Sequence, residues 1–411
     1  MSDLEQLMTA VPVSRRTFLQ GSTMAGFAAF LAACGTGGSP APTPGGTNIT
    51  GPLVWANWDA YIDLTTDPGP DGEEGTDDDE YVLPSPTLDE FAAEYGVEVE
   101  YANAEIEDNE TFMATIRQQL DTGVATGWDL IVLTDWMAAR VVGSNWAERI
   151  DPAHVPTAIA NVRDEYKGLE WDPDFEYHFP WQSGAVGVGY NVASTGRDLT
   201  KVADLFDPAF AGKVTLLSEV RDTFPLIHLM LQDQGIAASD HTPDQMDVAD
   251  CEAVHAFLKP YVESSHVTGF YGNEYLAAFA AGDTWASMVW SGDLASSGGE
   301  DDRFAYPEEG SMYFTDNLLI PKGAANWYTA EKMIDWCYDV DRAARIAAFI
   351  YYISPVKGVA EAIVELDPDA AENPLLFPPA DVLEKQYPEP AWDDEDVESE
   401  IKDLYADLAG V

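Results

Sequence analysis

Four short segments of the sequence place aromatic side chains beside acidic ones, and each follows a predicted strand. They are residues 57–61, 133–136, 218–224 and 290–293. In open α/β sheets, ligands bind beyond the carboxyl ends of the strands. Aromatic rings attract cations and pack on methylene groups, while carboxylates bind ammonium groups. This pairing of residue types suits a cationic ligand.

Motifs of the common enzyme classes are missing from the sequence. It contains no phosphate-binding P-loop, no G-x-G-x-x-G opening a helix after a strand, no G-x-S-x-G and no H-E-x-x-H. Cys251 and His255 lie four residues apart on a predicted helix, but two ligands without partners are more often packing residues. We therefore expect a binding protein without catalytic activity and without a cofactor.

The charge balance narrows the range of ligands. Asp and Glu number 73 against 20 Lys and Arg, which gives a formal net charge of −53. Nucleic-acid binding needs a basic surface and is excluded as a main role, whereas cationic ligands stay open. So large a charge repels itself when salt is low, which favours a halophilic, saline habitat. The alternative is an acidic surface that serves solubility alone.

The length and the pattern of elements predict two α/β lobes. A chain of 411 residues exceeds what one hydrophobic core normally organises. Residues 52–56, 97–101 and 129–133 have strand patterns, and helical spacing separates them, so this part predicts a parallel sheet. A similar alternation recurs beyond residue 185, and helical patterns dominate from Asn326 onward.

The N-terminus has the pattern of an export signal. Arg15 and Arg16 form a twin-arginine motif before an apolar run at residues 24–33, which is shorter than the roughly 20 residues that span a bilayer. The run ends at Cys34 in a segment that resembles a bacterial lipobox, where the Cys sulfur is acylated. We expect export by the twin-arginine route and a lipid anchor on the outer side of the cytoplasmic membrane, in the periplasm or at the cell surface. Residues 1–34 would be the signal and residues 35–51 a flexible tether.

Two further cysteines, Cys251 and Cys337, are too few for a disulfide framework and lack a C-x-x-C spacing. They could pair with each other or lie buried as small apolar side chains. The sequence leaves both alternatives open.

The four aromatic and acidic segments, taken together with three others, resemble the spermidine/putrescine-binding proteins of ABC importers. The additional segments are residues 180–191, 316–321 and 352–356, and the resemblance runs in order over about residues 52–400. It implies a type II periplasmic-binding-protein fold, an α/β fold whose two lobes are mainly parallel sheets flanked by helices and joined by crossing hinge strands. Crossing strands are expected near residues 179–190 and 288–293.

The same resemblance suggests the domain boundaries and the partners. Lobe 1 would comprise residues 52–184 and 292–340, and lobe 2 residues 185–291 and 341–411. A monomer would close over a polyamine and deliver it to a membrane permease.

Matching residue by residue gives the expected ligand-binding side chains. Asp59 and Asp135 are expected to be solvated or capping residues instead, and Arg221 a structural ion-pair partner. The expected binding residues are Trp58, Tyr61, Thr134, Trp136, Glu219, Asp222, Phe270, Tyr271, Trp290, Asp293, Tyr313, Phe314 and Asp316.

An acidic insertion follows Tyr61, at the mouth of the expected site. Asp67, Asp71 and Asp78 give it a partial likeness to an EF-hand calcium loop, but the third and twelfth positions break that pattern. A solvated acidic loop is favoured over a calcium site.

Two rival functions are weighed against polyamine binding. Some iron-binding relatives use adjacent tyrosines, and the chain has Tyr351 and Tyr352, although packing in an apolar helix end explains that pair better. An exported hydrolase could use Glu219 and Asp222 as an acid pair, but their spacing at one helix start argues against it.

Overall fold

The computed structural model describes residues 46–67, 80–82 and 85–410. Cys34, Asp71 and Asp78 lie outside these residues, as does the side chain of Asp67, so the expected lipid anchor and calcium loop concern parts that are not described. None of the described helices is both long and apolar enough to cross a bilayer.

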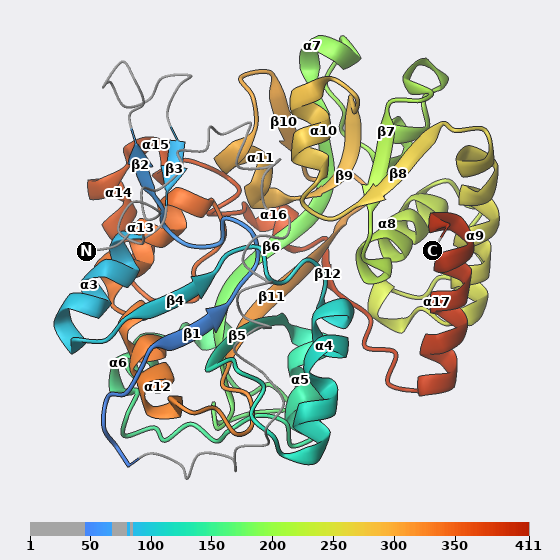
Figure 1. Ribbon diagram of the computed structural model, residues 1–411. Coiled ribbons are helices and arrows are strands. Elements are labelled where there is room, and N and C mark those ends of the chain that lie inside the picture. The colour runs from blue at the N-terminus through green and yellow to red at the C-terminus, as the bar shows by residue number, and fades with distance from the viewer. Residues whose placement is uncertain (1–45, 68–79, 83–84, 411) are drawn as a thin grey trace, which may run out of the picture.

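A single large mixed sheet forms the centre of the molecule (Figure 1), which confirms the predicted α/β class. Its strand order is β4-β1-β5-β11-β6-β9-β7-β8, with β10 paired to β6 and β12 to β11. The strands are β1 Leu53–Ala56, β4 Val99–Ala102, β5 Leu130–Thr134, β6 His178–Asn191, β7 Val214–Leu217, β8 Val267–Tyr271, β9 Ala286–Trp290, β10 Asp302–Ala305, β11 Ser311–Leu319 and β12 Gln386–Pro388. A separate hairpin pairs β2 Thr65–Asp67 with β3 Glu80–Val82.

Two groups of parallel strands flank a pair of long antiparallel strands. β4, β1 and β5 are parallel on one side, and β9, β7 and β8 on the other. β6 pairs with β11 through its first half and with β9 through its second, so it crosses between the groups as expected near residues 179–190. The other long strand is β11, which pairs with both β5 and β6. The crossing strand expected at residues 288–293 is instead the end of β9 and the start of α11, within the second group.

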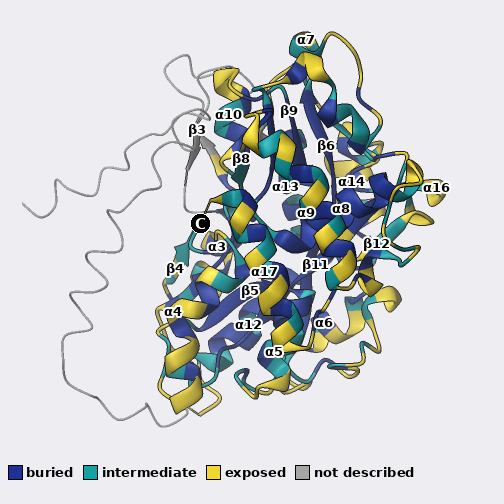
Figure 2. Cartoon of the chain, turned by 90° about the vertical axis from the view of Figure 1, so that its right-hand side faces the viewer, coloured by how far each residue is buried: buried dark blue, intermediate teal, exposed yellow. Residues whose placement is uncertain are grey.

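Helices cover both faces of the sheet, and their inner sides are buried (Figure 2). The strands between these helices have nearly continuous apolar sequences because both of their faces are covered. Every residue of β5 and of β7 is buried. The helices of eight or more residues are α3 Pro86–Tyr95, α4 Asn109–Thr122, α5 Asp135–Gly143, α8 Val220–Asp233, α9 Val248–Glu263, α12 Trp327–Cys337, α13 Val340–Ile350, α14 Val359–Leu366 and α17 Glu395–Ala409. The shorter ones are α6 Pro156–Asn161, α7 Val192–Thr195, α10 Tyr275–Ala281, α11 Ser291–Ser297, α15 Pro368–Ala371 and α16 Ala380–Leu383.

Helix α3 shows how local sequence sets an element. The Ser85 side chain accepts a hydrogen bond of 3.1 Å from the backbone N–H of Leu88, and Pro86 occupies the first turn. Gly96 ends the helix with a φ of 66°, a conformation that glycine adopts without strain. The helical pattern predicted between the strands at residues 52–56 and 97–101 is therefore confirmed by α3.

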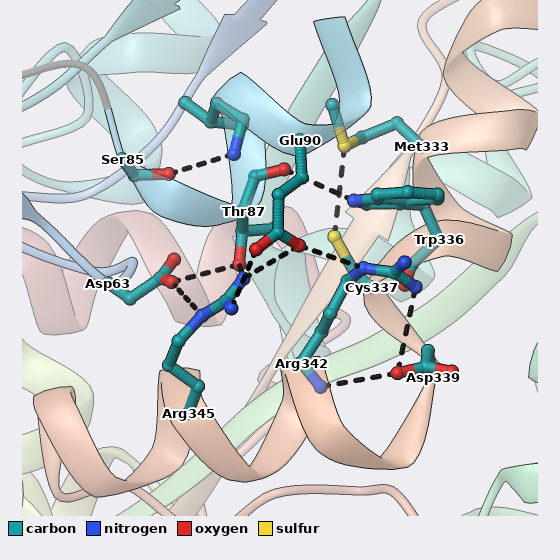
Figure 3. A network of polar contacts seen from close by, with 11 residues as sticks. Asp63, Ser85, Thr87, Glu90, Met333, Trp336, Cys337, Asp339, Arg342 and Arg345 are labelled. Atoms are coloured by element: carbon teal, nitrogen blue, oxygen red, sulfur yellow. Dashed lines mark hydrogen bonds and ion pairs between the residues drawn. The ribbon is translucent and has the colours of Figure 1, made fainter. Parts of the chain in front are cut away.

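A polar network joins α3 to the C-terminal helices (Figure 3). Arg345 of α13 donates to Asp63 at 2.7 Å and to Glu90 of α3 at 2.9 Å. On the neighbouring α12, the Cys337 thiol contacts the sulfur of Met333 at 3.8 Å. Cys251 and Cys337 are both free and buried, so they are packing residues.

Candidate functional site

A cavity opens where the two groups of strands meet, and the empty space within it, open solvent included, is about 460 Å³. Nine of the expected binding residues line it: Trp58, Tyr61, Thr134, Glu219, Asp222, Trp290, Asp293, Phe314 and Asp316. Five further residues complete the lining: Asp59, Asn109, Asn273, Tyr352 and Glu389.

Asp293, in the first turn of α11, is held by three donors. The hydroxyl groups of Tyr275 and Tyr352 donate to its two oxygens at 2.5 and 2.6 Å, and Asn273 donates at 2.7 Å. Burial nevertheless raises the pKa of this carboxyl. Fixed in place and buried, it is suited to hold an ammonium group.

Tyr352 reaches the cavity because glycines leave room for its ring. A Cβ at Gly184 would lie 2.7 Å from the ring, and one at Gly292 would lie 2.3 Å from it. The chain turns at Tyr351, which has a φ of 58° at the end of α13. The prediction that Tyr351 and Tyr352 merely pack in the helix end is therefore wrong for Tyr352.

Asp316 is positioned by β11, next to the carboxyl end of β5. Tyr61 and Thr134 donate to its two oxygens at 2.8 and 2.9 Å. Burial raises its pKa to about 7 although both hydrogen bonds act in the opposite direction.

The start of α8 contributes two more acids. Burial, helped by the charge of Asp222, raises the pKa of Glu219 to about 8, and Asn109 donates to this carboxyl from its backbone N–H at 3.3 Å. Asp222 accepts a hydrogen bond of 2.9 Å from Nε1 of Trp290. Its carboxyl also contacts that of Glu389, and burial raises the pKa of both groups.

Asp59, which follows β1, faces the cavity rather than solvent. Asn103 donates to it at 2.7 Å and also accepts from the N–H of Ala60, which fixes the turn. Burial raises the pKa of Asp59 to about 6, and the charge of Asp293 adds to this increase.

Two indole rings form a wall of the cavity. The ring centroids of Trp58 and Trp290 are 6.3 Å apart, with an angle of 69° between the planes. Oδ1 of Asp222 is buried and accepts no hydrogen bond from a neutral or basic group of the described residues. This oxygen is an acceptor for an ammonium ligand.

The charged side chains that line the cavity are all acidic. Six carboxyl groups line the cavity, and no Lys, Arg or His is among the lining residues. Buried carboxylates without a cation are unfavourable, which is why the pKa values of these six acids are raised. A ligand that brings positive charge and apolar methylenes would satisfy both the acids and the indole wall.

Four of the expected binding residues lie outside the lining. Trp136 packs on the Arg221 guanidinium, whose carbon is 3.7 Å from its ring centroid. Phe270 contacts Tyr405 instead, with ring centroids 5.4 Å apart. Tyr271 folds back over Gly269 of its own strand. Tyr313 is 38% exposed, because it alternates with Phe314 along β11 and points to the opposite face.

Arg221 is a structural residue, as predicted. It is 1% exposed and points away from the cavity, where it donates to Glu398 of α17 at 2.6 Å. Glu398 also accepts from Arg140 of α5 at 2.8 Å. The buried group thus ties α5, α8 and α17 together.

Metal ligation finds little support in the described residues. His255 pairs with Asp407 at 2.8 Å rather than sharing a ligand with Cys251. One group, His241, Asp247 and Asp250, brings possible ligand atoms within 4.8 Å of one another, but its members already bond to each other around the start of α9.

Comparison with known proteins places the chain among binding proteins. A family model described as bacterial extracellular solute-binding protein matches residues 87–378. The chain is 26% identical over 319 residues to the spermidine/putrescine-binding periplasmic protein 1 of Haemophilus influenzae, covering 77% of this chain and 82% of that protein. It is also 26% identical over 307 residues to the spermidine/putrescine-binding periplasmic protein of Escherichia coli, covering 74% and 82%.

A solved structure supports the fold independently. The spermidine/putrescine ABC transporter substrate-binding protein PotD of Streptococcus pneumoniae matches with a TM-score of 0.66 at 19% identity, covering 87% of this chain and 98% of that one. The periplasmic-binding-protein fold predicted from the sequence is thereby confirmed. At this identity, the likeness concerns the fold alone.

Proposed function

Because the chain belongs to the bacterial extracellular solute-binding proteins, we propose that it captures a polyamine, spermidine or putrescine, for an ABC importer. The observation that carries the proposal is the cavity itself, which has six carboxyl groups, an indole wall and no basic side chain in its lining. The names of the relatives in Haemophilus influenzae and Escherichia coli point to the same ligand class. The protein binds and releases its ligand without chemical change.

Capture would proceed by closure of two lobes. We propose that residues 52–184 and 292–340 act as one lobe and residues 185–291 and 341–411 as the other, with the ligand between them. Trp58 and Tyr61 would approach the amine from the first lobe, and Glu219 and Trp290 from the second. Closure removes water from the cleft, and each ammonium–carboxylate contact strengthens in the drier site.

The direct test compares two molecules of equal length that differ in charge. Putrescine should raise the melting temperature of the protein, whereas 1,4-butanediol, which lacks the charges, should not. Asp293→Asn should abolish the shift, because it removes a buried charge that Tyr275, Tyr352 and Asn273 hold in place. An equal shift with the diol would refute recognition of charge.

Export and anchoring belong to the same proposal. The twin arginines at 15 and 16 would send the folded protein across the membrane, and acylated Cys34 would keep the monomer near its permease. Replacing both arginines with Lys should leave the protein in the cytoplasm, and Cys34→Ala should leave it exported but unanchored. The net charge of −53 fits a saline habitat, so purification in high salt is expected to keep the protein folded.

A further inference from the structure

Helix α17 belongs to one of the proposed lobes and contacts the other. It packs along α9 in its own lobe (Figure 1). Ile401, Tyr405 and Leu408 are buried at helical spacing and give α17 an apolar side for this packing. Glu398 lies one turn before Ile401 on the same side and is only 7% exposed. A carboxylate so deeply buried needs partners, and those of Glu398 come from both lobes.

The lobe that contains α17 fixes Glu398 in place. Arg221 of α8 donates to its Oε1 at 2.6 Å. Arg221 is itself held by the backbone carbonyls of Pro390 and Ala391, to which it donates at 3.1 and 3.2 Å. The ammonium group of Lys402, one turn further along α17, lies 3.3 Å from the same Glu398 oxygen. This side of the contact is therefore ordered within its own lobe.

The other lobe contributes one cation and one anion. Arg140, in the last turn of α5, donates to Oε1 of Glu398 at 2.8 Å. Glu110, in the first turn of α4, pairs with Lys402 at 2.5 Å and lies 3.5 Å from the Arg221 guanidinium. Three of the 20 basic residues of the chain meet here, although acids far outnumber them. We call the group the α17 latch; its members are Arg140 and Glu110 of the first lobe and Arg221, Glu398 and Lys402 of the second.

The α17 latch lies next to the cavity but outside it. Arg221 is flanked in the sequence by Glu219 and Asp222, which both line the cavity. Asn109, the residue before Glu110, donates from its backbone N–H to Glu219 at 3.3 Å, which is a further contact between the lobes. None of the five latch side chains is among the described residues that line the cavity. A ligand in the cavity therefore does not touch them.

Opening of the lobes would separate the latch pairs at moderate cost. The side chain of Arg140 is 33% exposed and that of Glu110 is 34% exposed even while the lobes touch, so water can solvate both once they part. Contacts of this kind shift the balance toward the closed form without locking it. The affinity measured for a ligand depends on how much of the protein is in the form that binds it.

We propose that the α17 latch holds the two lobes closed and that Arg140 is a positioning residue that prolongs the bound state. The pairs between the lobes form only after the lobes meet, so the latch acts on release of the ligand rather than on its capture. Its effect is the same for every ligand over which the lobes close. This inference rests on the proposed function, which supplies the closure.

Arg140→Gln tests the latch, because Glu398 keeps Arg221 and Lys402 as partners and the fold is retained. Dissociation of spermidine and of putrescine, measured by stopped flow in constant high salt, should be faster by about 3- to 30-fold, between the effect of an exposed ion pair and that of a hydrogen bond to a charged group. Association should stay within about twofold. Both amines should show the same factor, and Arg140→Lys should restore part of the native rate.

A matched control is Arg197→Gln. The partners of Arg197 are Asp204 and Asp207, at 2.9 and 3.1 Å, and all three residues belong to one lobe. Loss of these pairs should leave both rates unchanged. An equal acceleration in Arg197→Gln and Arg140→Gln would overturn the latch.

Small-angle scattering of the ligand-free proteins tests the same idea without any amine. Arg140→Gln should have a larger radius of gyration than the native protein, and Arg197→Gln the native radius. Unchanged dissociation in Arg140→Gln, an effect on association alone, or equal radii in all three proteins would overturn the latch. Failure of the native protein to bind either amine, with radii that differ as expected, would instead overturn the proposed function and keep the latch.

Discussion

Ligand affinity should depend steeply on pH, because the acids of the cavity are partly protonated before the amine arrives. Glu219 has its pKa raised to about 8 and Asp316 to about 7. An alkyl ammonium group has a pKa of about 10, so the amine itself stays positively charged between about pH 6 and pH 8. Bound amine favours the ionised carboxylates and therefore releases protons, and affinity must rise with pH.

The magnitude follows from the fraction of each acid that is ionised. With a pKa of about 8, Glu219 is about 1% ionised at pH 6 and about half ionised at pH 8, so its linkage alone strengthens binding about 50-fold across this range. Asp316, with a pKa of about 7, strengthens binding by a further factor of about 10 over the same pH range.

Calorimetric titrations with spermidine at pH 6, 7 and 8 in constant high salt measure this slope. Glu219→Gln removes the contribution of this carboxyl and should reduce the change in affinity between pH 6 and pH 8 by about 50-fold. An affinity that is flat or that falls with pH, in protein shown to be folded at each pH, would refute the reasoning.

Three further predictions concern the wall, the buried ion pair and the thiols. Trp58→Leu should weaken polyamine binding about 2- to 30-fold in the same titration, because it removes a cation–π contact worth about 0.5–2 kcal/mol; unchanged affinity would show that the ring does not touch the ligand. Arg221→Ala should lower the free energy of unfolding in urea by about 1.5–3 kcal/mol, the range for a hydrogen bond to a charged group, because Glu398 keeps Arg140 and Lys402 as partners. Arg117→Ala at an exposed i,i+4 pair should cost less than about 1 kcal/mol, and equal losses would contradict the structural role of Arg221. Both cysteines of the described part are buried, so a thiol reagent should modify them only after unfolding, and rapid reaction of the native protein would contradict their burial.

Much of the fold could be predicted because local patterns decide many of its elements. The apolar run of β5 and the capped helix α3 carry their own signals, and both formed close to the expected residues. Long-range pairing carries no such signal. β11 lies between β5 and β6 in the sheet and pairs with both, and nothing in its own residues specifies those partners.

In the candidate site too, residues placed by local sequence could be predicted, whereas those placed by long-range packing could not. Acids that follow predicted strands, such as Asp222 and Asp293, were predicted to bind ligand and do line the cavity. Tyr352 and Glu389 were not among the expected binding residues, since one enters through space left by Gly184 and Gly292 and the other through the pairing of β12 with β11. Trp136 had the right position in the sequence but packs on Arg221.

The central claim is that the acidic cavity holds a polyamine, and one calorimetric titration at pH 8 in high salt tests it most directly. We predict one-to-one binding of spermidine with a dissociation constant in the micromolar range or tighter, and its loss in Asp293→Asn. Absence of heat with both spermidine and putrescine, from native protein shown to be folded, would contradict the claim.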